Sequence, residues 1–171
     1  MLRTVRIAIG IAVLLGASMA LVAPASAGDP PVQDGRIGKQ IGGNFKGARV
    51  INETGKKQTV SKTVPVGATA VFYVKTKNLG GAPEDHADGS DSSPCFRVRY
   101  LTAFTGGIDV TSSVVAGVDG TIPPGTTFKS RFEVKVKGCA SPGDVKTVRL
   151  DWSPVNPPLD HDRVRGRVIV G

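Results

Sequence analysis

The chain has 171 residues, with 22 Lys and Arg against 14 Asp and Glu and a formal net charge of +8 at pH 7. Val is far more frequent than Leu, and 22 Gly and 12 Pro are spread along the chain. This usage excludes an all-α bundle and suits many short strands joined by turns. The length predicts one domain.

The first 27 residues have the three parts of an export signal. Arg3 and Arg6 are basic, the run IAIGIAVLLGASMALVA is apolar, and Ala25 and Ala27 are the small residues that a signal peptidase needs. We therefore expect residues 1–27 to be a signal peptide cleaved after Ala27, and the mature protein to be secreted without an integral membrane anchor. An uncleaved anchor is the alternative, because the apolar run approaches the length of a spanning helix.

After the leader, residues 28–48 carry many Gly and few apolar residues, which predicts an extended N-terminal arm or an irregular first strand. Residues 49–171 predict a single β domain, because polar and apolar residues alternate in runs separated by turn signals. We expect about seven strands, near residues 57–64, 69–77, 95–104, 109–116, 127–137, 145–152 and 163–170.

The strand faces indicate how these strands pack. In FKSRFEVKVK at 128–137, Phe and Val alternate with Lys, Arg and Glu, which is typical of a half-buried antiparallel strand. Val148, Leu150 and Trp152 share one phase of a later strand, so we expect Trp152 to be buried. Two antiparallel sheets that face each other would bury all these apolar sets in one core, so the predicted fold is an all-β sandwich.

The chain has two cysteines, Cys95 and Cys139, and both follow the export signal. In an oxidising compartment they form the only possible intramolecular pair, so we predict a disulfide. A reactive thiol or a metal pair is the alternative, but neither Cys has a close His and no C-x-x-C motif is present.

Motifs of catalysis are missing from the sequence. There is no G-x-S-x-G, H-E-x-x-H, S-x-x-K or P-loop pattern, so we predict no catalytic residues and no cofactor. The alternative is a small secreted hydrolase that uses His86 or His161 with nearby carboxylates. Asp160 and Asp162 flank His161, but adjacent side chains of a strand point to opposite sides, which favours a solvated turn.

The segment APEDHADGSDSSP at 82–94 gathers acidic residues in an otherwise basic protein. Oxygen-rich loops can hold calcium, and the weak candidates for metal ligands are Glu84, Asp85, Asp88 and Asp91. The spacing does not match a calcium-binding loop, because Ala87 falls where a ligand would be needed. We interpret the segment as a mobile polar loop and predict no metal site.

Basic residues recur on the polar phase of several strands. The candidates for polyanion binding are Arg97, Arg99, Lys135, Lys137, Arg163, Arg165 and Arg167. If their strands lie in one sheet, they form a cationic surface for anionic wall polymers, lipid headgroups or nucleic acid. The alternative is that these charges provide solubility and edge protection. Nearly every Phe lies in the apolar phase, so aromatic rings do not interleave with these charges and we expect no specific nucleic-acid binding.

The stretch from Val50 to Val170 resembles the immunoglobulin-like β-sandwich modules of secreted bacterial proteins, near the CARDB and DUF11-type group. The matching segments are TAVFYVKTKNLGGAPED, FRVRY, GGIDVTSSVVAG, IPPGTTFKSRFEVKV and DHDRVRGRVIV. The resemblance implies a single immunoglobulin-like antiparallel sandwich that acts as a spacer or an interaction surface. We therefore expect a secreted, non-enzymatic structural or binding module at the cell exterior, with an anionic cell-wall polymer or another exported protein as its partner.

Overall fold

The computed structural model describes residues 32–81, 83–154 and 161–171. The predicted signal peptide and the start of the predicted arm lie outside these residues. Within them, no helix has both the length and the apolar character needed to cross a membrane.

Nine strands and one short helix form the described part of the chain. In chain order they are β1 (Gln33–Gly38), β2 (Thr59–Val64), β3 (Thr69–Asn78), β4 (Glu84–Gly89), β5 (Phe96–Leu101), α1 (Thr111–Ala116), β6 (Val118–Thr121), β7 (Thr127–Val136), β8 (Val145–Ser153) and β9 (Asp162–Val170). They form a four-stranded sheet in the order β1-β3-β7-β5 and a five-stranded sheet in the order β2-β9-β8-β4-β6.

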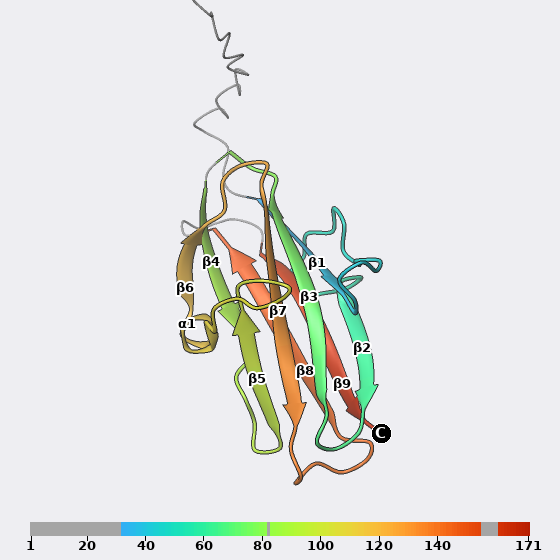
Figure 1. Cartoon of the computed structure of the whole chain (residues 1–171). Coiled ribbons are helices and arrows are strands. Elements are labelled where there is room, and N and C mark those ends of the chain that lie inside the picture. Colours follow the sequence, from blue (N-terminus) through green and yellow to red (C-terminus); the bar gives the residue numbers. More distant parts are fainter. Residues whose placement is uncertain (1–31, 82, 155–160) are drawn as a thin grey trace, which may run out of the picture.

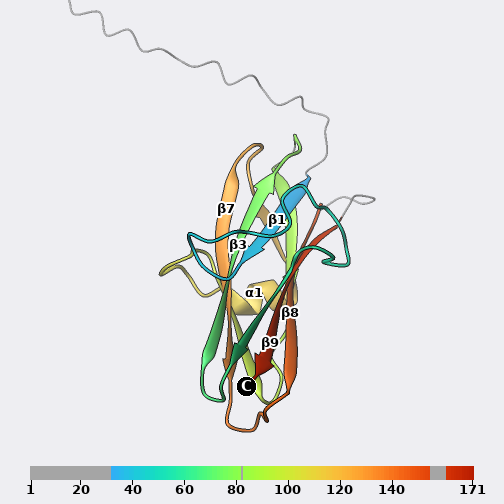
Figure 2. The ribbon, with the colours of Figure 1, turned by 90° about the vertical axis from the view of Figure 1, so that its right-hand side faces the viewer.

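The two sheets pack face to face, with the long strands running along the molecule (Figure 1). Figure 2 views the layers edge-on, with β3 and β7 on one side and β8 and β9 on the other. Paired strands are antiparallel except β2, which runs parallel to β9 at a sheet edge. The predicted all-β sandwich is confirmed at this level.

The core lies between the sheets, where the predicted alternation places it. The rings of Phe72 and Phe132 stack with centroids 5.1 Å apart. Trp152 is only 3% exposed, as its phase beside Val148 and Leu150 predicted. Gly166 faces the same core, and a Cβ there would lie 2.6 Å from the Phe132 ring. A glycine at this position therefore allows the aromatic pair to approach the backbone of β9.

Six of the seven predicted strands have counterparts, but the strand predicted at 109–116 is wrong. This segment contains helix α1. The carboxylate of Asp109 accepts hydrogen bonds from the backbone N–H of Thr111 at 3.1 Å and from its hydroxyl at 2.5 Å. Such a turn gives the backbone an alternative to a strand ladder. Val110 and Val114, four residues apart, then lie on one side of the turn.

The interpretation of residues 82–94 as a mobile polar loop is also wrong, because the segment contains strand β4 between β8 and β6. Along β4, Asp85 and Ala87 face the interior, and so does Gly89. A Cβ at Gly89 would lie 2.6 Å from the hydroxyl of Tyr100, so only glycine leaves room for that side chain. The expected irregular first strand is a regular strand, β1, paired with β3.

The predicted disulfide between Cys95 and Cys139 is confirmed, with the two Cα atoms 5.3 Å apart. Cys95 directly precedes β5 and Cys139 follows β7, and these strands are neighbours in the four-stranded sheet. The backbone N–H of Lys137 donates to the carbonyl of Cys95 at 2.9 Å. The bond therefore fastens the same end of two paired strands.

Reduction of this disulfide is expected to lower the free energy of unfolding by up to about 4 kcal/mol, because the unfolded chain gains the freedom of a loop of about 45 residues. Urea unfolding with and without reductant measures the difference. Mass spectrometry without reductant should give a chain lighter than the reduced form by the mass of two hydrogens. Equal unfolding midpoints in the two states would contradict the prediction.

Candidate functional site

The basic residues predicted to bind polyanions lie on two different sheets. Arg97 and Arg99 on β5 and Lys135 on β7 belong to the four-stranded sheet, and Lys137 follows β7 directly. Arg163, Arg165 and Arg167 lie on β9 in the five-stranded sheet. Because the outer faces of a sandwich point in opposite directions, the structure does not bring the seven residues together on one surface.

The arginines of β9 stand on a face of mixed charge. Nε of Arg163 lies 2.6 Å from Oδ1 of Asp151, a carboxylate that is only 4% exposed. Arg149 contacts the same Asp151 at 2.8 Å and Asp88 at 3.1 Å. The hydrogen bond to Asp151 raises the pKa of Arg163. Within the described part of the chain, only Arg165 and Arg167 among the β9 arginines have no ion pair.

The outer face of the four-stranded sheet is more strongly basic than the sequence indicated. The strand register places Arg36 opposite Lys75, and Lys75 opposite Lys129, in a row of three basic side chains across β1, β3 and β7. Arg97 and Lys135 form a second such pair across β5 and β7. We use the term cationic face for Arg36, Lys75, Lys77, Arg97, Arg99, Lys129, Arg131, Lys135 and Lys137.

Few carboxylates balance these charges. Asp34 lies 2.5 Å from Arg36, and Glu133 contacts Arg131 at 2.9 Å and Arg99 at 3.6 Å. Asp109 also contacts Arg99, at 2.9 Å. In residues 32–81, 83–154 and 161–171, six members of the cationic face have no carboxylate within ion-pair distance: Lys75, Lys77, Arg97, Lys129, Lys135 and Lys137. The face therefore keeps a net positive charge.

Three aromatic rings lie beside these charges, contrary to the expectation that aromatic and basic residues do not interleave. The rings of Phe45 and Phe104 stack at 5.9 Å, and Tyr73 meets Phe104 edge-on at 5.4 Å. Nζ of Lys75 lies 4.2 Å from the centre of the Phe45 ring. Tyr73 stands in the polar phase of β3, which was a signal in the sequence, whereas the two Phe residues arrive from loops.

Arg131 holds one of these loops against the sheet. Its Nη1 donates to the carbonyls of Ala103 and Gly106, both at 2.7 Å. The other loop is fixed by Ile37 and Lys46, whose backbone groups exchange hydrogen bonds of 2.9 and 2.8 Å. The aromatic rings therefore sit on a sheet surface rather than on free loop ends.

The two histidines have different surroundings. His86 is on the outer side of β4, where its Nδ1 is 2.7 Å from Oδ1 of Asp119 on β6. His161 is exposed just before β9, and the neighbouring Asp162 is fully buried. Oδ1 and Oδ2 of Asp162 accept hydrogen bonds from the Gln58 side chain at 2.7 Å and the Gly35 backbone at 2.5 Å. Asp162 thus fastens β9 to β1 and to the residue before β2.

The candidates for metal ligands at residues 84–91 are kept apart, because successive side chains of β4 point to opposite faces of the sheet. Glu84 begins the strand, Asp85 faces the interior, and Asp88 points outward to Arg149. Asp91 follows in the next loop and accepts a hydrogen bond from the backbone of Ser92. No group of three His, Cys, Asp or Glu side chains that could hold a metal ion occurs among the residues the structure describes.

The structure thus defines a two-sheet β-sandwich with one disulfide and one cationic face. No protein-family model and no curated protein sequence matches the chain. Among solved structures, it is similar to part of a family 123 glycoside hydrolase from Clostridium perfringens, studied for glycolipid glycan hydrolysis. The TM-score is 0.50 at 8% identity, over 81% of this chain and 27% of that chain. The chain therefore spans about a quarter of that hydrolase, and the likeness shows the fold alone.

A second similar structure is PapD-like domain 7 of human CEP192, with a TM-score of 0.40 and 14% identity over 67% of this chain and 81% of that chain. Neither similarity concerns particular site residues. The resemblance to CARDB and DUF11-type modules stays a prediction.

Proposed function

We propose that the protein is a secreted, non-enzymatic binding module that contacts anionic polymers of the cell envelope through its cationic face. The observation that carries this proposal is a set of six basic side chains on one side of the four-stranded sheet, none of which has a carboxylate partner among the described residues. Alternate residues of a strand are about 7 Å apart and neighbouring strands about 4.8 Å apart. This regular array suits a polymer that repeats phosphate or carboxylate groups along its length.

The aromatic rings on the same face support a polymer rather than a free ion as the partner. Phe45, Tyr73 and Phe104 present half-buried ring surface next to Lys75. Aromatic rings combine a large apolar area with a fixed geometry, so they can pack against the uncharged part of a polymer backbone. The charges then hold the anionic groups on either side.

We also propose that the sandwich is immunoglobulin-like. The order β1-β3-β7-β5 follows the A, B, E, D sheet of such domains, and β9-β8-β4 follows strands G, F and C. Strand β6 comes after β5 in the chain and has no counterpart in that strand order. The disulfide does not join the two sheets as in antibody domains, since both cysteines flank strands of the four-stranded sheet. Export is supported by the three-part leader of residues 1–27.

The test compares two matched charge reversals in the mature protein, residues 28–171. Arg97→Glu with Lys129→Glu changes the cationic face, and Arg165→Glu with Arg167→Glu changes the opposite face by the same net charge. Polyglycerol phosphate is the probe. We expect the first pair to weaken binding by at least about tenfold and the second pair to have little effect, because contacts rather than total charge decide affinity.

Salt provides the second readout. Binding by the unmodified protein should fall steeply between low and physiological ionic strength, because salt screens exposed charges. Circular dichroism and thermal melting establish that all variants fold. Equal losses for the two variants, or no retention of polyglycerol phosphate at low salt, would refute the proposal. Cleavage of the polymer would refute its non-enzymatic part, and binding only to another exported protein would favour a protein partner.

A further inference from the structure

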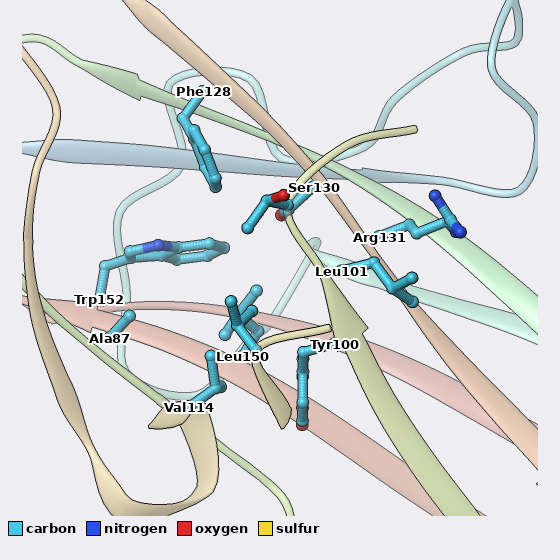
Figure 3. A pocket seen from close by; sticks show the side chains of 11 residues that line it. Ala87, Tyr100, Leu101, Val114, Phe128, Ser130, Arg131, Leu150 and Trp152 are labelled. Atoms are coloured by element: carbon cyan, nitrogen blue, oxygen red, sulfur yellow. The ribbon is translucent and has the colours of Figure 1, made fainter. Parts of the chain in front are cut away.

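A cavity opens between the two sheets on the side that carries α1. Its outer part has a volume of about 310 Å³ and lies between β4 and β6 of one sheet and the start of β7 of the other. An adjoining inner part of about 60 Å³ is shown in Figure 3. Both parts are lined by Ala87, Thr102, Val110, Val114, Phe128 and Trp152. The outer volume alone is within the range of small-molecule sites.

The walls of the cavity are mainly apolar. In Figure 3 the rings of Trp152 and Phe128 approach the same space from different strands, with Leu150 and Val114 on the other side. Trp152 is 3% exposed, whereas Phe128 is 41% exposed, so Phe128 marks the opening to solvent. Helix α1 supplies Val114 to this wall.

Two buried polar atoms in these walls have no hydrogen-bond partner among the described residues. They are Oδ1 of Asp85 and Oγ of Ser130. Asp85 is one of the residues that line the outer part, and Ser130 is one of those that line the inner part. The two residues are 3% and 8% exposed. Buried side-chain oxygens are normally paired in native proteins, so an unpaired one beside a cavity calls for a ligand or a water as its partner.

The charge of the cavity selects the kind of ligand. Among the residues that the structure describes, no Lys or Arg lines the outer part. Asp119, which lies 2.7 Å from His86, adds a second carboxylate at its edge. Arg131 borders the inner part, but its guanidinium is engaged with Ala103, Gly106 and Glu133. Burial raises the pKa of Asp85 to about 7, because the apolar walls disfavour its charge. A cation beside Asp85 would remove that penalty, whereas an anion would increase it.

We propose that this cavity binds a small, mainly apolar molecule that carries one protonated amine. The amine donates to Oδ1 of Asp85, and the apolar body packs against Trp152 and Phe128. The site lies between the sheets and shares only Arg131 with the cationic face. Amine binding is therefore additional to polyanion binding, and either can fail without the other.

The experiment uses the mature protein with three probes that share a phenyl group and differ in charge: phenethylamine, phenethyl alcohol and phenylacetate. Trp152 is the single Trp of the chain, so its indole N–H signal in NMR and its fluorescence report directly on the cavity. We expect phenethylamine to shift the indole signal saturably, and to bind at least about tenfold more tightly than the alcohol. Phenylacetate should not bind.

Two variants test the assigned contacts. Asp85→Asn keeps the shape of the side chain and should remove the preference for the amine over the alcohol. Asp91→Asn makes the same charge change in the exposed loop after β4 and should preserve that preference. Ala87→Leu fills the shared wall and should weaken both the amine and the alcohol.

Binding of the three probes to the unmodified protein tests the proposed amine site even if a variant does not fold. No saturable indole shift with millimolar phenethylamine would overturn the proposal. So would equal affinity for the amine and the alcohol, or an unchanged preference in a folded Asp85→Asn variant.

Discussion

Replacing Trp152 with Ala is expected to lower the free energy of unfolding by about 3 to 5 kcal/mol, the usual cost of removing a large buried aromatic side chain. Trp152 is 3% exposed, and its ring lies so close to β1 that a Cβ on Gly35 would be 2.7 Å from it. The indole therefore packs β8 of one sheet against β1 of the other. Its loss removes apolar contact on both sheets and enlarges a cavity that is already present.

Such a loss is a large share of the 5 to 15 kcal/mol that stabilises a typical domain. Urea unfolding followed by circular dichroism measures it, since the variant has no Trp fluorescence. Ile108→Ala is a suitable control, because Ile108 is 72% exposed and its truncation should change stability by less than about 0.5 kcal/mol. Trp152→Phe should fall between the two. A loss below about 1 kcal/mol for Trp152→Ala would mean that the indole is not part of the core.

The sequence predicted those strands whose inner phase is apolar. In β7, Phe132 and Val134 alternate with charged residues over ten positions, so phase and burial both follow from a period of two. The phase of Trp152 was predicted for the same reason. The disulfide also followed from the sequence, because a chain with two cysteines has a single possible intramolecular pairing.

Strands whose inner phase is not apolar were predicted wrongly or only in part: β4 was assigned to a loop, and the region of β1 to an extended arm or an irregular first strand. β4 turns Asp85 and Gly89 inward, and β1 turns Gly35 inward, so neither segment shows an apolar stripe. The reason lies in distant partners: Gly35 makes room for Trp152 and Gly89 makes room for Tyr100. No local pattern contains that information. For the same reason, the sequence pattern predicted a polar loop at Asp85, whose carboxylate is buried.

The candidate site was predicted in part, because a strand pattern gives the outward phase but not the sheet that a strand joins. Arg97 and Arg163 share the outward phase, yet β5 and β9 belong to opposite layers. A strand pattern also does not predict ion pairs between strands. Asp151 on β8 neutralises Arg163 on the neighbouring β9. The aromatic contribution of Phe45 depends on how a loop folds over β1, which no short-range pattern specifies.

The raised pKa values of two buried carboxyl groups predict how the free energy of unfolding changes with pH. Burial raises the pKa of Asp85 from 3.8 to about 7. Burial also raises the pKa of Asp162 from 3.8 to about 6, although the side chain of Gln58 and the backbone N–H groups of Gly35, Asn52 and Arg163 donate to it and oppose the shift. In both cases the folded state binds the proton more tightly than the unfolded state does.

The free energy of unfolding is therefore expected to fall as the pH rises from about 4 to about 8. The contribution is complete below the unfolded pKa of 3.8 and is lost as the pH passes through the folded values of about 6 and about 7. These differences correspond to at most about 4 kcal/mol for Asp85 and about 3 kcal/mol for Asp162. Urea unfolding across this range measures the slope.

Asp85→Asn should remove the larger part of this slope, because the amide cannot ionise and its burial no longer disfavours a charge at neutral pH. The variant should accordingly be more stable than the unmodified protein at pH 8 and differ little from it at pH 4. Asp91→Asn, an exposed change of the same charge, should keep the full slope. If the unmodified protein were equally stable across this range, or if Asp85→Asn left the slope intact, the carboxyl of Asp85 would have to be solvated or paired in the folded protein, and its place inside the cavity would be wrong.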